Sequence, residues 1–134
     1  MMTGSFRIAG AVKAEQYDWG IFRSVIDPPS TGAKRLTVVE ATFAPGTGHG
    51  FHKHPDQEAV IYVVAGKLEQ WLDREKRILG SGDAVFIPAG MVHALFNAGE
   101  GDAKLIAIFG PCVGEAGYQT VDVAGEPAWS GLRN

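Results

Sequence analysis

Short apolar runs separated by turn-forming residues constrain the fold of this chain more than any other feature. Between Arg35 and Phe109 no apolar stretch is long enough for a substantial helix, and the runs end at groups rich in Gly, Pro, Asp or Ser. The 18 glycines and 7 prolines among 134 residues agree with such a pattern of tight turns. We therefore expect an all-β fold whose strand spacing suits a sandwich or barrel.

The runs predict six core strands and two outer ones. The core strands are expected at residues 36–43, 58–64, 67–72, 84–87, 93–97 and 105–109. An edge strand is expected at 17–22 and a tail strand at 118–123, whereas the Pro-containing segment 27–32 is expected to form a loop. The aromatic residues expected mainly in the core are Phe51, Tyr62, Trp71, Phe86 and Phe96. Trp129 is expected to pack against the barrel or a second subunit.

Charge and composition exclude several classes of partner. The formal net charge is −3 with no block of like charge, which argues against a nucleic-acid surface. The longest apolar run, residues 59–65, is too short to span a membrane, and the N-terminal residues do not resemble a secretion signal. A single cysteine, Cys112, cannot form an internal disulfide and is interpreted as structural. We expect one cytoplasmic domain over residues 1–134, with no membrane partner.

Three of the four histidines lie within six positions of one another. His52 and His54 are two residues apart, so on a strand their side chains point to the same face, about 6.6 Å apart. Two such imidazoles with a third ligand would hold a divalent metal ion, and Glu58 and His93 are the candidates for that third ligand. His49 is out of register with His52, and we expect it at most to line the entrance of the site.

Two longer patterns resemble the two sequence motifs of the cupin family. The first, over residues 46–66, contains Gly46, His52, His54, Glu58 and Gly66. The second, over residues 82–97, contains Gly82, Pro88, Gly90, His93 and Asn97. Residues 1–33 and 114–134 then flank the region that carries the motifs.

The resemblance implies a double-stranded β-helix, or jelly-roll barrel, that binds one divalent metal ion per chain. Its ligands would be His52, His54, Glu58 and His93, and the ion would be iron, manganese, zinc, nickel or copper. The turn at 88–90 would bring the strand that begins at His93 beside the strand that carries His52. We interpret Asn97 as a structural hydrogen-bonding residue.

Glu58 departs from the family's usual spacing by one residue. Seven residues separate it from Gly66 where six are usual, and the six-residue spacing would place the ligand at Ala59. Because strand side chains alternate, Glu58 faces the metal only if a bulge at residues 55–57 shifts it inward. We predict this bulge, because a carboxylate beside Val60 and Tyr62 on the outer face would have no evident partner.

The site that the resemblance implies favours catalysis at a metal ion. Three histidines leave two or three coordination positions for substrate or dioxygen, so a dioxygenase acting on a small dicarbonyl, phenolic or organic-acid substrate is the first hypothesis. A non-catalytic binding or sensing protein and a metal-dependent isomerase or lyase are the alternatives. We also expect a homodimer, because open sheets leave edge strands to be covered. Metal binding should weaken as the pH falls through about 6.5.

Overall fold

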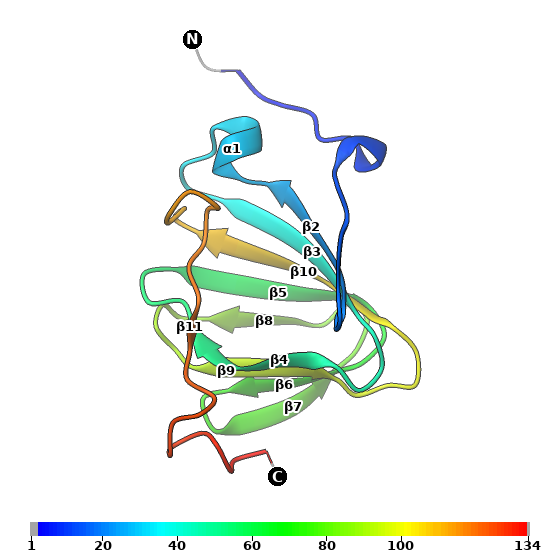
Figure 1. The fold of residues 1–134 in the computed structure, drawn as a ribbon, viewed down its shortest axis with the longest axis vertical. Helices are drawn as coiled ribbons and strands as arrows, with labels where there is room; N and C mark the ends of the chain where they lie inside the picture. Colours follow the sequence, from blue (N-terminus) through cyan, green and yellow to red (C-terminus); the bar gives the residue numbers. More distant parts are fainter. Residues whose placement is uncertain (1–2, 134) are drawn as a thin grey trace.

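Two antiparallel sheets face each other in the computed structural model, which describes residues 3–133 (Figure 1). In spatial order, the six-stranded sheet contains β1 (Glu15–Tyr17), β2 (Gly20–Ile26), β3 (Thr37–Phe43), β10 (Ala103–Gly110), β5 (Glu58–Ala65) and β8 (Ala84–Ile87). The five-stranded sheet contains β11 (Val121–Asp122), β4 (Gly48–Lys53), β9 (His93–Asn97), β6 (Leu68–Leu72) and β7 (Glu75–Leu79). The expected all-β jelly roll is confirmed.

Alternating side chains fill the space between the sheets. In β3 and β10 every second residue is buried, as the two-residue period of a strand requires when one face meets a core. Phe43, Val63, Leu68 and Ile87 are at most 1% exposed and join the two sheets. The buried stripes of both sheets thus form one apolar core, which also supports the site described below.

The predicted core strands correspond to β3, β5, β6, β8, β9 and β10, with small shifts at their ends. Sequence reasoning missed β7, because Glu75, Lys76 and Arg77 leave this edge strand almost wholly exposed and without an apolar stripe. The loop expected at 27–32 instead contains one helical turn, α1 (Pro28–Thr31). Asp27 caps that turn by accepting a hydrogen bond from the Ser30 N–H at 2.9 Å. Within residues 3–133, no helix has the length and apolar character needed to cross a membrane.

The chain after β10, coloured orange to red in Figure 1, runs across the strand ends from one sheet to the other. Its strand, β11, covers only two residues of the predicted 118–123 and pairs with β4. Trp129 packs on Phe51 with ring centroids 5.5 Å apart, in a second apolar cluster outside the five-stranded sheet. The expectation that Trp129 packs against the barrel is therefore confirmed.

Two of the aromatic residues expected in the core lie on the surface instead. Tyr62 in β5 and Phe86 in β8 are 45% and 53% exposed on the outer face of the six-stranded sheet. The structural role predicted for Asn97 is confirmed, since its buried amide donates to the carbonyl oxygens of Phe43 at 2.9 Å and Gly101 at 2.8 Å. The first bond connects β9 to the end of β3, and the second connects it to the loop before β10.

Candidate metal centre

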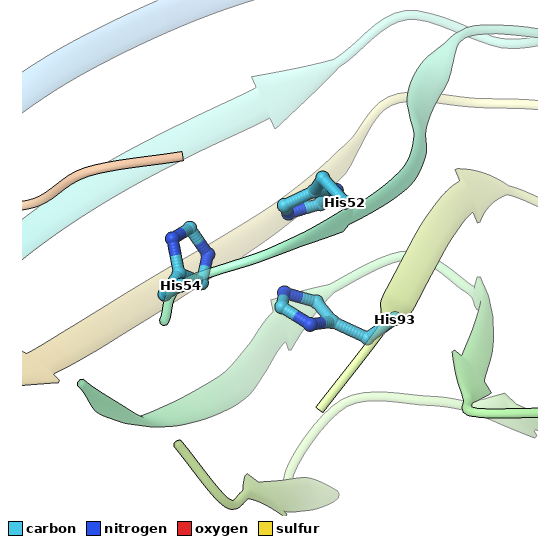
Figure 2. Close-up of side chains that lie close together, drawn as sticks. All are labelled: His52, His54 and His93. Atoms are coloured by element: carbon cyan, nitrogen blue, oxygen red, sulfur yellow. The ribbon is translucent and has the colours of Figure 1, made fainter. Parts of the chain in front are cut away.

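Three imidazole rings converge at one end of the space between the sheets (Figure 2). His52 in β4 pairs directly with His93 in β9, and their ring centroids are 4.2 Å apart. His54, directly after β4, lies 5.1 Å from the first ring and 5.0 Å from the second. One nitrogen from each ring lies within 4.8 Å of the other two. The predicted pairing of the two motif strands is confirmed, and it places three ligand atoms around one point.

Hydrogen bonds to backbone carbonyls fix the orientation of all three rings. The Nδ1 atoms of His52, His54 and His93 lie 2.6, 2.7 and 2.9 Å from the carbonyl oxygens of Gly50, Gln119 and Met91, respectively. A carbonyl oxygen only accepts, so each Nδ1 carries the hydrogen and each Nε2 keeps its lone pair. In this tautomer Nε2 is free to bind a metal ion, and hydrogen-bonded second partners of this kind are usual for metal-ligating histidines. The donor set therefore fits a divalent ion.

Burial keeps the three rings neutral. Desolvation lowers the pKa of His54 to about 4 and that of His93 to about 3. The pKa of His52 is lowered as well, again mainly by burial. Neutral imidazoles have the free lone pair that metal binding needs, so at neutral pH the cluster needs to release no proton before it binds an ion.

Glu58 lies outside this cluster. It is the first residue of β5, exposed on the outer face of the sheet, where it lines a groove with Arg35 and Phe86. The pairing of β5 with β10 is regular from Glu58 to Val63, so Ala59 and not Glu58 faces inward. The bulge expected at residues 55–57 does not turn the carboxylate inward, and strand alternation accounts for the result. The structure thus brings together three of the four predicted ligands.

His49 lies closer to the site than its spacing predicted. In the β4–β9 pair, His49 is opposite Leu95 and His52 is opposite His93, so three steps along β4 match two along β9. This bulge places both histidines on the inner face, with ring centroids 6.2 Å apart. His49 contacts Trp19 and Phe43 edge-on and lines the same cavity as the other three. Burial lowers its pKa too.

The histidines form one wall of a cavity of about 490 Å³. The opposite wall, on the six-stranded sheet, includes three small side chains: Ala41, Ala59 and Ala107. The aromatic residues around the cavity are Phe22, Phe43, Phe109 and Tyr118. Among the cavity-lining residues of the described chain, Asp122 is the one carboxylate and none is Lys or Arg. A ligand here therefore meets a mainly apolar surface beside the nitrogen cluster.

The C-terminal segment completes the cavity, which sequence reasoning did not foresee. Tyr118, Thr120, Asp122 and Ala124 line it, and the intervening Gln119 carbonyl holds His54. Their two-residue spacing was a usable signal, since alternate residues of the predicted tail strand share a face.

Comparisons with known proteins agree with this architecture. The sequence model of the family described as "Cupin domain" matches residues 39–109. The chain is 35% identical over 97 residues to pectin degradation protein KdgF of Dickeya dadantii, covering 72% of this chain and 84% of the relative. It is 31% identical over 103 residues to polyketide synthase CurC of Streptomyces cyaneus, covering 77% of this chain and 67% of the relative. The solved structure of the polyketide cyclase RemF from Streptomyces resistomycificus superposes with a TM-score of 0.69 at 25% identity, covering 98% of this chain and 99% of that structure.

Proposed function

The chain belongs to the cupin domain family, and from that premise we propose that it is a metal-dependent enzyme that closes rings on flat, largely apolar polycarbonyl compounds. His52, His54 and His93 would hold one divalent ion per chain. The observation that carries the proposal is the lining of the cavity beside them, which is apolar and aromatic and, among residues 3–133, contains no Lys or Arg.

This lining favours one class of substrate over another. A sugar acid, such as a pectin fragment, presents a carboxylate and several hydroxyls, which need cationic or hydrogen-bonding partners when they are buried. The cavity offers instead the rings of Phe22, Phe43, Phe109 and Tyr118, which suit flat conjugated ligands. The carboxylate of Asp122 further disfavours an anionic ligand. The names of CurC and RemF support a polyketide-like substrate over a pectin fragment.

A bound divalent ion supplies a Lewis acid that polarises carbonyl and enol oxygens. Ring closure joins the acidic carbon between two carbonyls to a further carbonyl carbon. The proton removed from the first carbon ends on the new alkoxide, and loss of one water then gives the double bond. His49, neutral and facing the cavity, is placed to accept the first proton on an imidazole nitrogen. The apolar walls would exclude bulk water and hold the linear substrate in a folded conformation, with its reacting carbons close together.

A dioxygenase is the second candidate, and the position of Glu58 favours it. With the carboxylate outside the cluster, a divalent ion held by three neutral histidines would keep its full double charge and have positions open for other ligands. Such a centre would accept an enolate and dioxygen together. This candidate requires iron or another redox-active ion, whereas ring closure does not.

One experiment separates these candidates. Metal-free protein is loaded with Zn²⁺ or, anaerobically, with Fe²⁺ and incubated with linear aromatic polyketones, β-diketones and unsaturated uronates. Ring closure predicts a product lighter by one water, formed with Zn²⁺ and without oxygen uptake, and lost in His93→Ala. Oxygen uptake with Fe²⁺ alone would establish the dioxygenase instead. Tight binding with no turnover under any condition would show a binding protein.

A further inference from the structure

Gln57 is a buried polar side chain near the metal centre that the proposed reaction does not use. It is 2% exposed, and its amide makes three hydrogen bonds to backbone groups of the C-terminal part of the chain. Its Nε2 donates to the carbonyl oxygens of Pro111 at 2.7 Å and Gly117 at 3.0 Å. Its Oε1 accepts from the Gln119 N–H at 3.1 Å. Both ends of the amide are therefore used to hold one backbone segment.

That segment also carries the carbonyl that orients a candidate metal ligand. The Gln119 N–H is bonded to Gln57, and the Gln119 carbonyl oxygen accepts from His54 Nδ1 at 2.7 Å. The Gln119 side chain is exposed, so it is the backbone of this residue that connects the two side chains. Gln57 is thus connected to the imidazole of His54 by two hydrogen bonds, one on each side of the Gln119 backbone.

The other contacts of the segment lie on either side of Gln119, where Tyr118 stacks on Phe109 and β11 pairs with β4 from Val121 onward. Gly114 and Gly117 both have positive φ angles, 72° and 97°, which only glycine adopts without strain. Residues 114–116, 119 and 120 are exposed and contribute little burial. Besides the bonds of Gln57, the Gly117 carbonyl accepts from the hydroxyl of buried Thr37 at 2.9 Å. Loss of the Gln57 amide would therefore leave the Gln119 N–H without its partner and loosen the backbone that holds the Gln119 carbonyl against His54.

We propose that Gln57 is a positioning residue of the metal centre, which holds the Gln119 carbonyl against His54 and so sets the affinity for the ion. The inference rests on the proposed metal site. Groups that orient a metal-ligating histidine commonly change metal affinity 10–100-fold when they are lost. Because Tyr118 and Thr120 flank Gln119 and line the cavity, the same amide also connects metal binding to one wall of the substrate site.

The test compares two buried glutamines. Gln57→Met keeps the side-chain length and removes every hydrogen bond, and Gln70→Met is its matched control. Gln70 is 3% exposed and its Nε2 donates to the carbonyl oxygens of Trp71 and Ala94 at 3.1 Å, in β6 and away from the cavity lining. Thermal unfolding of the metal-free proteins, Zn²⁺ affinity by competition titration and the visible spectrum of the Co²⁺ forms are measured for both.

We expect Gln57→Met to lose about tenfold or more in Zn²⁺ affinity and to change the Co²⁺ spectrum. Gln70→Met removes two hydrogen bonds of a buried amide in the same way and should leave affinity within about twofold. The inference is wrong if Gln57→Met keeps wild-type affinity and spectrum while His54→Ala loses binding. If wild type and His54→Ala bind Zn²⁺ equally, the proposed metal site itself fails.

A second measurement needs no variant of Gln57. In the wild-type protein, Zn²⁺ should slow hydrogen exchange at the Gln119 amide about tenfold, since an ion on His54 holds the carbonyl of the same residue. The Ser30 amide, which is also bonded to a side-chain oxygen but lies at α1, should change little. Equal slowing at both amides would indicate global stabilisation and contradict the inference.

Discussion

Glu58 and Ala59 are neighbours in β5 but lie on opposite faces of the six-stranded sheet, so the alanine lines the histidine cavity and the carboxylate does not. This relationship decides the ligand set. The outward carboxylate shares its groove with Arg35 rather than with any histidine.

The first prediction concerns these two positions. Glu58→Ala should leave Zn²⁺ affinity within about twofold, because the carboxylate lies outside the cluster, whereas His93→Ala should lower it at least about 100-fold. Ala59→Glu should introduce a carboxylate facing the cavity and lower the affinity for anionic enolate ligands, since it cancels one charge of the ion. Isothermal titration measures both affinities. A tenfold loss of Zn²⁺ affinity in Glu58→Ala would instead restore Glu58 as a ligand.

The second prediction concerns pH. The pKa values of His54 and His93 in the folded state are about 4 and about 3, well below the 6.5 of an exposed histidine. Protons should therefore displace the ion at least about one pH unit below the 6.5 expected for unshifted rings. A titration of bound Co²⁺ by its visible spectrum gives the midpoint of release. A midpoint at 6.5 or higher would contradict the role of burial.

The lowered pKa values of His54 and His93 also determine whether the free energy of unfolding rises or falls with pH. The unfolded chain takes up protons on these rings near pH 6.5, whereas the folded chain takes them up only at lower pH. The free energy of unfolding of the metal-free protein should therefore be at its full value above about pH 7 and fall as the pH falls below about 6.5. Urea unfolding followed by tryptophan fluorescence checks this. His54→Phe, which has no proton to gain, should reduce the dependence.

The third prediction tests the cavity. Ala107, in β10, faces the space beside the histidines, and Ala107→Leu would fill part of it. We expect the affinity for aromatic polyketone ligands to fall about tenfold or more while Zn²⁺ affinity stays unchanged, because the added atoms occupy space that the ligand needs. Ala84→Leu adds the same atoms at an exposed position of β8 and is the control. Unchanged ligand affinity in Ala107→Leu would show that substrates bind elsewhere.

The sequence predicted the fold and most of the site for a physical reason. Apolar alternation and turn residues identify strands that bury one face, and the His52–His54 spacing identifies two rings on that face. Sequence patterns could not show on which face Glu58 lies, because a single bulge reverses it. The same limit explains His49, which an actual bulge moved to the inner face.

The hydrogen-bond partners of the histidines were beyond sequence reasoning as well. Gly50 and Met91 accept from rings two residues away, but the carbonyl that orients His54 belongs to Gln119, 65 residues later in the chain. Backbone carbonyls leave no mark on residue type, since any amino acid supplies one. The cavity wall formed by the C-terminal segment depends on such a long-range contact.

The last prediction concerns the surface formed by Tyr62 and Phe86, two residues that were expected in the core but are exposed. They lie on the outer face of adjacent, paired strands, and Val60, the direct partner of Phe86, lies on the same face. Exposed aromatic clusters of this kind mark interaction surfaces. The groove beside them contains Arg35 and Glu58, a cation and an anion on one face. An exposed aromatic face with a cation and an anion in the groove beside it suits a self-complementary contact, so we propose that a second copy of this chain covers the face.

Phe86→Glu should then convert a dimer to a monomer, because it places two like charges in an apolar interface. Ile78→Glu, at an equally exposed position of the edge strand β7, is the control and should leave the dimer intact. Sedimentation equilibrium over a range of protein concentrations measures the association. A wild-type protein that stays monomeric at about 100 µM, a concentration that micromolar interfaces saturate, would exclude this face as an interface between copies. A dimer that Ile78→Glu disrupts and Phe86→Glu does not would place the interface at the edge of the five-stranded sheet instead.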